Sequence, residues 1–320
     1  MRAESQLHEK KHSLLTADGR KYIGRQFWRN RYIYLMILPV VAYFVIFRYV
    51  PMWYLRVAFY DYKLLRGFAG SKFVGLKHFD AFIHSMNFTQ IVGNTLAINF
   101  LGLIFAFPCP VIFALFLNEI SNTAFKKTVQ TISYLPHFLS TVIIVSMMNS
   151  LLSVQTGIVN AVLKSLNMNT IYFMGDPNWF RTLYVLSGIW QGTGWGAIIY
   201  ISALSGINPE LYEAATVDGA GRFSKMWHVS LPGIRETVVI MLIMRIGQMM
   251  SIGFEKPFLM QNSLNISVSE VISTYVYKLG LQRADYSRST AIGLFNSVIN
   301  LMLVLIANTA CRKLTDSSLF

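Results

Sequence analysis

Six long apolar runs divide the sequence, and they constrain its fold more than any other feature. A helix needs about 20 mostly apolar residues to cross the hydrocarbon core of a bilayer. The runs are Tyr32–Pro51, Ile91–Leu117, Thr131–Leu152, Phe180–Ser205, Glu236–Phe254 and Ser289–Ala310. We therefore expect an all-α, polytopic membrane protein with six transmembrane helices. Prolines inside the runs are compatible with this, because neighbouring helices satisfy the carbonyl groups that a proline frees.

The composition supports a membrane chain and excludes several other classes. Of the 320 residues, 54% are hydrophobic and only 13% are charged, against about 25% charged in average soluble domains. A disordered chain, a collagen-like repeat or a disulfide-rich secreted scaffold would need a very different composition. The sequence shows no paired carboxylates, nucleophile and base set or paired metal-ligand spacing. We expect no catalytic, cofactor or metal site, and an integral membrane enzyme is the weaker alternative.

The net charge of +13 indicates how the chain is oriented. Short cytoplasmic segments of membrane proteins carry an excess of Lys and Arg. With the N-terminus inside, the inner segments hold 15 Lys and Arg against ten in the outer ones. Residues 1–31 are expected to form a cytoplasmic basic tail with a helix on the inner leaflet, residues 32–310 the membrane domain, and residues 311–320 a second cytoplasmic tail. The basic excess thus indicates topology, and we expect no nucleic-acid partner.

The connection between the fourth and fifth runs, residues 206–234, has a distinct pattern. Pro209 can start a short helix that runs to Ala215, a Gly-rich turn follows, and a second short helix can end at Leu231 and Pro232. Pinned between two spans, such a hairpin would move with them. The same pattern is equally consistent with an amphipathic loop that lies at the membrane interface and has no special function.

A resemblance distinguishes between these two interpretations. The series Glu213, Ala214, Ala215, Asp218, Gly219 and Ala220, followed by Leu231 and Pro232, resembles the cytoplasmic EAA signature of ABC importer permeases. Residues 134–137, 253–256, 271–277 and 291–297 also resemble the LplB-type, maltose-permease-like branch of carbohydrate importer permeases. The resemblance implies the type I permease fold. It also implies that this loop is a coupling helix, in which Glu213, Ala214, Ala215, Asp218 and Gly219 form the docking face and turn.

The same resemblance implies the partners and the cargo. Members of this branch pair with a second, smaller permease, two ATPase subunits that bind ATP and Mg, and an extracytoplasmic solute-binding protein. The implied role is a subunit of a bacterial cytoplasmic-membrane importer for oligosaccharides or polysaccharide fragments, including acidic ones such as alginate. The binding protein would dock on outer loops around Tyr54–Phe88 and Gln261–Tyr286. A non-sugar cargo is the alternative, and a secondary carrier is disfavoured because no inverted repeat is visible.

Polar side chains within the runs are the candidates for the cargo pathway, because buried charge in a membrane is costly. Arg245 and Gln248 share one helix face, and Asn296 and Asn300 share another. Trp190 and Gln191 are further candidates, since aromatic faces stack on sugar rings and amides bind hydroxyls. Alternatively, Arg245 pairs with a carboxylate of the partner permease and the asparagines crosslink helices.

Glycines recur every four residues in the fourth run, at Gly188, Gly192 and Gly196, with Gly194 between them. This spacing removes side chains from one helix face and allows another helix to approach closely. We expect helix packing here and no cofactor binding.

Overall fold

The computed structural model describes residues 28–315 and divides the chain into two compact units after Arg56. Most of the expected basic tail, residues 1–27, and the last residues, 316–320, lie outside the described part. The first unit is helical, with α3 (Arg31–Phe44), the π-helical turn η1 (Val45–Tyr49) and α4 (Val50–Trp53) in succession. No residue of α3 is buried, although almost all are apolar, which is the pattern of a helix in contact with lipid or another subunit.

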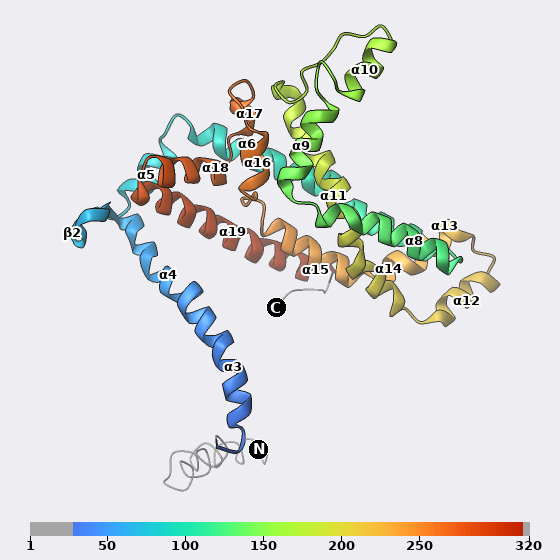
Figure 1. Cartoon of the computed structure of the whole chain (residues 1–320). Coiled ribbons are helices and arrows are strands. Elements are labelled where there is room, and N and C mark those ends of the chain that lie inside the picture. Colours follow the sequence, from blue (N-terminus) through green and yellow to red (C-terminus); the bar gives the residue numbers. More distant parts are fainter. Residues whose placement is uncertain (1–27, 316–320) are drawn as a thin grey trace. The chain divides into compact units, whose positions relative to one another are not determined.

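Helices dominate the second unit as well, and Figure 1 shows their arrangement. It begins within the 3-10 helix η2 (Tyr54–Phe59), and its described residues include one two-stranded sheet beside the helices. In chain order its elements are β1 (Tyr60–Lys63), η3 (Leu64–Arg66), β2 (Gly67–Phe73), α5 (Lys77–Ile83), α6 (Phe88–Leu101), η4 (Gly102–Ala106), α7 (Pro108–Asn118), α8 (Thr123–Tyr134), η5 (Leu135–Phe138), α9 (Thr141–Leu151), α10 (Ile158–Ser165), α11 (Pro177–Ser205), α12 (Pro209–Val217), α13 (Arg222–Lys225), η6 (Met226–Ser230), α14 (Leu231–Gly233), α15 (Arg235–Ile246), α16 (Glu255–Met260), α17 (Ile266–Ser269), α18 (Ile272–Tyr277), η7 (Lys278–Gln282) and α19 (Tyr286–Thr315).

Within residues 28–315, three helical stretches are long and apolar enough to cross a membrane. They are Arg31–Phe59, Phe88–Asn118 and Tyr286–Lys313. They contain the first, second and sixth predicted spans. The fourth predicted span coincides with α11, a single helix of 29 residues that is less apolar because it carries glycines and polar side chains.

Two of the predicted spans are not continuous helices. The third breaks at residues 139–140, shortly after Pro136, where Thr123–Phe138 and Thr141–Leu151 meet at an angle of 97°. Proline lacks the N–H that would continue the helix, and Ser140 then caps α9 by accepting from the Ile143 N–H. The fifth is helical only to Ile246, after which residues 247–254 run irregularly into α16. The apolar pattern located both runs, and neither is one continuous helix in the structure.

The core of the second unit forms where α11 crosses the other long helices. Apolar side chains of α7 and α11, with Ile234 from the start of α15, make one buried cluster, including Val111, Ala114, Tyr200 and Leu204. A second cluster joins Phe82, Ile91 and Ile292 from α5, α6 and α19. Burial of such side chains stabilises a helix pair mainly through close packing in a membrane. The two clusters fix the helices that form the site described below.

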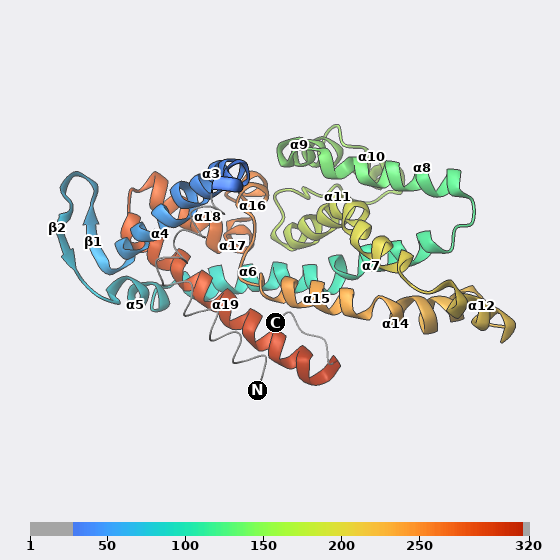
Figure 2. The same ribbon diagram turned by 90° about the horizontal axis from the view of Figure 1, so that it is seen from below.

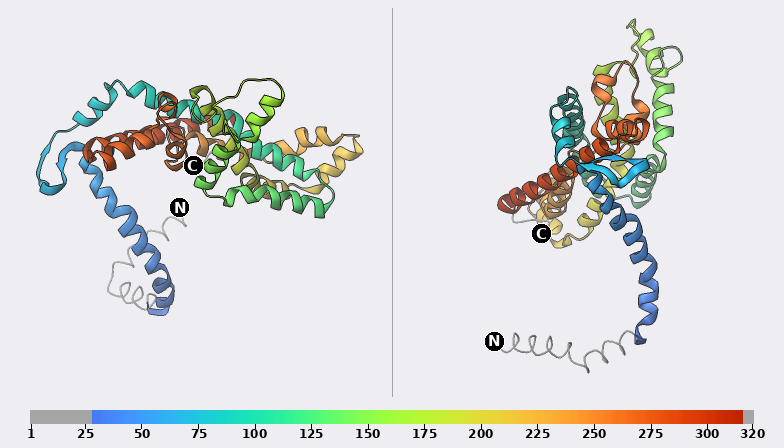
Figure 3. Two further views of the ribbon diagram at one scale, coloured as in Figure 1. Left: turned by 45° about the horizontal axis from the view of Figure 1, so that its top comes forward. Right: turned by 90° about the vertical axis from the view of Figure 1, so that its left-hand side faces the viewer.

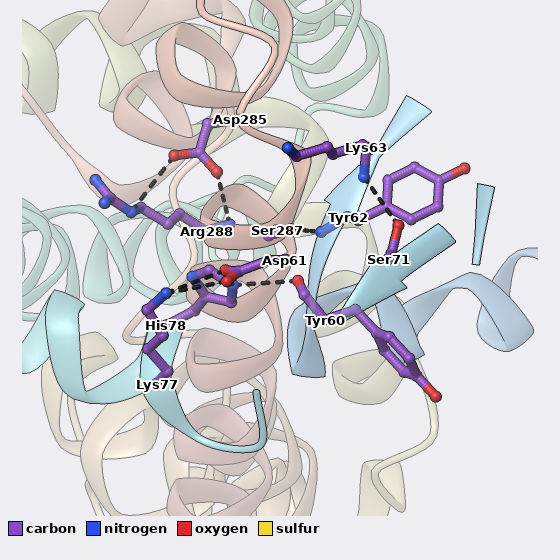
Figure 4. Close-up of polar contacts among 10 residues, drawn as sticks. All are labelled: Tyr60, Asp61, Tyr62, Lys63, Ser71, Lys77, His78, Asp285, Ser287 and Arg288. Carbon is purple, nitrogen blue, oxygen red and sulfur yellow. Dashed lines mark hydrogen bonds and ion pairs between the residues drawn. The ribbon is translucent and has the colours of Figure 1, made fainter. Parts of the chain in front are cut away.

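The β1–β2 hairpin is antiparallel, with Tyr60 opposite Phe73 and Asp61 opposite Lys72. Its base is anchored by polar contacts, which Figure 4 shows. The Asp61 carboxylate lies 3.0 Å from Lys77 Nζ of α5, and the Tyr62 N–H donates to Ser287 Oγ of α19 over 2.8 Å. The hairpin is therefore fastened to both helices beneath it. Within this unit, the hairpin and the α12–α13 region lie at opposite ends (Figures 1 and 2), as the left view of Figure 3 also shows.

Candidate functional site

A cavity of about 510 Å³ opens between the long helices of the second unit. Its walls come from α6, η4, α7, α11 and α15, and the irregular segment before α16 closes one side. The lining residues with polar side chains are Asn99, Tyr184, Thr193, Tyr200, Arg245, Gln248, Ser251 and Lys256. Apolar residues and glycines make up the rest of the lining. A largely apolar pocket with a few convergent polar groups is the usual form of a small-molecule site.

Two cations and no carboxylate line this cavity, so its charge is positive. Lys256 donates from Nζ to the Tyr184 carbonyl oxygen over 2.9 Å, and its Nζ lies 4.6 Å from the centre of the Tyr184 ring. Among the described residues, the guanidinium of Arg245 has no hydrogen-bond or ion-pair partner. Arg245 is therefore available to an incoming group, whereas Lys256 is held in place by Tyr184.

The glycines of α11 serve two purposes. Gly194 and Gly196 pack closely, since a Cβ would overlap the Ser133 carbonyl of α8 at the first and press on Pro110 of α7 at the second. Gly188, Gly192 and Gly196 line the cavity, and a Cβ at Gly192 would meet no atom within 4 Å. The expected close packing thus holds for part of the series, and the remainder makes room in the cavity.

The sequence candidates for the pathway separate into two groups in the structure. Arg245 and Gln248 both line the cavity. The other candidates do not, and their side chains lie elsewhere. Asn300 bonds to the backbone of Met250 and to Ser251, Gln191 donates to the Leu139 carbonyl over 3.3 Å, and Trp190 is 48% exposed on the outside of α11. Asn296 has a buried Oδ1 without a hydrogen-bond partner among the described residues.

Lys256 was not among the sequence candidates, and the broken fifth span explains why. The predicted span ended at Phe254, which placed Lys256 in the next outer connection. Because the chain leaves its helix at Ile246 and re-enters one at Glu255, Lys256 lies beside α11 and faces the cavity. One signal in the sequence could have identified Lys256. It follows Arg245 by only 11 residues, and the stretch between them contains polar side chains.

The second candidate site is the loop between α11 and α15, at residues 206–234, which we call the coupling loop after the role that its sequence resemblance implies. Asn208 caps α12 by accepting from the Glu210 N–H over 3.1 Å, and Pro209 occupies the first helical position. The helix ends at Val217, and Gly219 turns the chain with a φ of +80°, a conformation that glycine adopts at little cost. The second arm runs through α13, η6 and α14. Both predicted short helices are thus present, each slightly longer than expected.

One face of the coupling loop is open and the other is packed. Glu213, Ala214, Asp218 and Gly219 are exposed, and Ala215 is half-buried. At the base, Leu231 packs on the α7–α11 cluster together with Ile207 and Met226. Gly233 lies so close to Ile207 that a Cβ would overlap its side chain. Pro232 is exposed beside it. The loop therefore presents a polar tip on a base fixed to the cavity helices.

A cavity between long apolar helices, together with an exposed helical loop at one end, is typical of a multi-pass transport protein. A model of the family described as binding-protein-dependent transport system inner membrane component matches residues 98–315. The chain belongs to this family. The expected type I permease fold and the role as a transport component, not an enzyme, are thereby confirmed.

Individual relatives agree with the family. Protein LplB of Bacillus subtilis (strain 168) is 44% identical over 292 residues, which are 91% of this chain and 92% of LplB. The polygalacturonan/rhamnogalacturonan transport system permease protein YteP of the same organism is 42% identical, covering 95% of this chain and 94% of YteP. Among solved structures, a chain of a bacterial alginate ABC transporter in complex with an alginate pentasaccharide-bound periplasmic protein superimposes with a TM-score of 0.84 at 39% identity, covering 92% of this chain and 99% of that one.

Proposed function

We propose that this chain is one permease subunit of a bacterial ATP-binding-cassette importer for acidic oligosaccharides, working by alternating access. The observation that carries the acidic cargo is the charge of the cavity, which is lined by Arg245 and Lys256 and by no carboxylate. An uronate would find a charge-assisted partner there, and a carboxylate is best bound by an arginine with no other partner. The names of YteP and of the alginate transporter, which specify acidic polysaccharides, support the same class of cargo.

Within this proposal the polar and aromatic groups divide the work of binding. The Arg245 guanidinium receives a carboxylate, while Gln248 and Ser251 exchange hydrogen bonds with sugar hydroxyls. Lys256, already bonded to Tyr184, adds positive charge without needing to move. Gly188 and Gly192 keep α11 free of side chains where the sugar passes. In the low-dielectric interior of a membrane protein, each of these contacts is stronger than in water.

Energy for transport would come from partner subunits through the coupling loop. The exposed Glu213, Ala214, Asp218 and Gly219 are the surface that an ATPase subunit would contact, and Ala215, Leu231 and Pro232 shape the helix and base behind it. Glu213 makes no ion pair with another described residue, so its charge is available to a basic groove. The full assembly would contain a second, homologous permease, two ATPase subunits that bind ATP and Mg, and an extracytoplasmic solute-binding protein. Both termini of this chain would be cytoplasmic.

The hairpin end of the second unit is the proposed docking place for the solute-binding protein. It lies opposite the coupling loop (Figure 2) and carries exposed basic side chains at Lys63, Arg66 and Lys72. Leu65 at the hairpin tip is fully exposed. Because the hairpin base is anchored to α5 and α19, a protein bound there would be held firmly over the outer part of the membrane domain.

The proposed cargo is tested by uptake in proteoliposomes that contain the whole importer and its binding protein. Variants Arg245→Gln and Lys256→Gln remove charge and keep polarity. Each should reduce uptake of an uronate oligosaccharide by about tenfold or more, as expected for a lost charge-assisted hydrogen bond. A carboxyl-reduced, neutral form of the same oligosaccharide should be much less affected.

Arg312→Gln is the matched control, because Arg312 is exposed near the end of α19 and far in sequence from the cavity lining. It should leave uptake of both cargoes unchanged. Equal losses for the acidic and the neutral cargo in Arg245→Gln would contradict the proposal. If this variant instead fails to copurify with the second permease, Arg245 pairs with a carboxylate of that subunit, which is the competing explanation.

A further inference from the structure

The break in the fifth predicted span places irregular backbone beside the cavity. Helix α15 ends at Ile246, and residues 247–254 follow no regular helix before α16 begins at Glu255. Backbone N–H and C=O groups at membrane depth must find hydrogen-bond partners within the protein. Within this segment Met250 and Ile252 are buried. The groups that satisfy this turn therefore decide whether it has one fixed shape.

Two asparagines hold the turn from opposite helices. Asn99 of α6 donates from Nδ2 to the Met249 carbonyl over 2.8 Å and to the Ser251 carbonyl over 3.4 Å. Asn300 of α19 accepts at Oδ1 from the Met250 N–H over 3.0 Å and donates from Nδ2 to Ser251 Oγ over 2.8 Å. Three successive residues of the turn are thus bonded by side chains from two helices, neither of which is its chain neighbour.

The turn that the asparagines hold is itself part of the cavity wall. Gln248, Ser251, Ile252 and Gly253 all line the cavity, and Arg245 lies in the last turn of the helix directly before it. These four residues of the turn lie within a few positions of the backbone atoms to which Asn99 and Asn300 form hydrogen bonds. A shift of the turn by one bond length would therefore move Gln248 and Ser251 relative to the cargo.

We propose that Asn99 and Asn300 are positioning residues for the transport site. They act through the backbone of Met249 and Met250 and through Ser251, and they hold Gln248 and Ser251 in the orientation that meets the cargo. Asn300 does not line the cavity, so its part is carried entirely through the turn. This inference rests on the proposed function, because the cavity is taken as the path of the cargo.

The position of the turn is measured directly by thiol labelling. In the assembled importer, with Cys109→Ser and Cys311→Ser as background, Gln248→Cys places one reactive thiol on the cavity wall. Adding Asn99→Leu or Asn300→Leu should change the labelling rate at residue 248 by about fivefold to tenfold, because each substitution removes two hydrogen bonds from the turn. Unchanged rates in both variants would overturn the proposal.

Asn94 offers a closely matched control. It lies on the same helix as Asn99, is buried to the same 4% exposure, and also donates from Nδ2 to two loop carbonyls, those of Ser267 and Glu270. Its loop does not line the cavity. Asn94→Leu should leave the labelling of residue 248 as it was. If it alters labelling as much as Asn99→Leu does, general loosening explains the result and the positioning role is refuted.

Substitution of each asparagine by aspartate tests whether these particular hydrogen bonds hold the turn, because the two positions differ in what they need. Asn300→Asp keeps the acceptor that the Met250 N–H needs, and the Ser251 hydroxyl can turn to donate to it. Asn99→Asp faces two carbonyl oxygens with a group that cannot donate when ionised. Asn300→Asp should therefore restore most of the native labelling rate, while Asn99→Asp should not. Restoration by both, or by neither, contradicts the geometry.

Transport measurements keep this proposal distinct from the proposed function. Gln248→Ala and Asn300→Leu should each reduce uptake, and the loss in the double variant should be smaller than the two single losses combined, because Asn300 acts on the cargo partly through Gln248. Additive losses would overturn the positioning role. If Gln248→Ala leaves uptake unchanged while Asn99→Leu still alters labelling, the cargo path through the cavity is wrong and the positioning of the turn stands.

Discussion

The hydroxyl oxygens of Tyr212 in α12 and Ser230 in η6 lie 3.0 Å apart, so a hydrogen bond joins the two arms of the coupling loop. A second bond, from Lys225 Nζ to Thr216 Oγ1 over 2.7 Å, crosses the same loop nearer its tip. Ser230 is 1% exposed, whereas Thr216 is exposed. The bond between Tyr212 and Ser230 is therefore the less exposed of the two braces.

Tyr212→Phe should loosen this brace without unfolding the chain. The loss is about 1 kcal/mol for one hydrogen bond, and the ring keeps its packing. We expect more ATP to be hydrolysed per cargo molecule imported, since part of each movement of the loop would be lost before it reaches the cavity. Tyr172→Phe serves as the control, because Tyr172 is exposed and lies outside the loop. An unchanged ratio of ATP to cargo in Tyr212→Phe would show that the bond has no part in coupling.

Gly219→Ala should weaken coupling through the backbone alone. A Cβ at this position would meet no atom within 4 Å, so the cost comes from the φ of +80°. A non-glycine residue there costs about 1 kcal/mol. Gly221→Ala is the matched control two residues away, with equally open space and a φ of −71°. Cargo-stimulated ATPase activity should fall in the first variant and not in the second, and equal activities would refute the turn's role.

Gly102→Ala should displace the Arg245 guanidinium from the cavity. A Cβ at Gly102 would lie 2.9 Å from an Arg245 Nη atom, which is the flexible end of a long side chain and can move at little cost to stability. Uptake of an acidic oligosaccharide should fall, with the thermal unfolding temperature of the importer nearly unchanged. Gly93→Ala, at a position of α6 with open space and outside the cavity lining, should leave uptake unchanged. The reverse order would contradict the role assigned to Arg245.

The stability of the hairpin should depend on acid pH through Asp61. The hydrogen bond from Lys77 lowers the pKa of the Asp61 carboxyl, with the basic groups of Lys77, His78 and Lys72 acting in the same direction and partial burial opposing them. The unfolded value is about 3.9, so the stabilisation is present above that pH and is lost as the pH falls through the lower folded value.

Hydrogen exchange of the hairpin amides, compared between the native chain and Asp61→Asn at each pH, measures this effect (Figure 4). The difference in protection between the two chains should be present at neutral pH. It should disappear as the pH falls below the pKa of the Asp61 carboxyl in the folded chain. Asp80→Asn, at an exposed ion pair with His84, should leave the hairpin amides unchanged. A protection difference that persists in strong acid would exclude ionisation of Asp61 as its source.

Much of the fold could be predicted from the sequence because the relevant signals are local. Runs of apolar residues locate α6–α7, α11 and α19 to within a few residues. Pro209 and Gly219 mark the start of α12 and the turn after it. These features depend on neighbours along the chain, and composition and spacing record them directly.

The rest depends on contacts between distant residues. Asn300 shares a helix face with Asn296, which predicted a common cavity wall, yet its amide bonds a backbone N–H 50 residues away in sequence. Just after α15 ends, Gly247 lies so close to Val304 that a Cβ would overlap its side chain, and Asn99 bonds the backbone of the turn that follows. Lys256 reaches the cavity only because of that break. Hydropathy along the chain carries no information about such contacts between residues that are distant in sequence.

The connectivity of α11, the coupling loop and α15 has a thermodynamic consequence. The loop begins where α11 ends at Ser205 and ends where α15 begins at Arg235. Because both helices are cavity walls, a change in the distance between them also changes the position of the loop. Any ligand that prefers one separation must then shift the affinity of whatever binds the loop, by the same factor in both directions. In the proposed importer, an oligosaccharide held near Arg245 would therefore change how tightly an ATPase subunit bound to the loop holds its nucleotide, although the two ligands never touch.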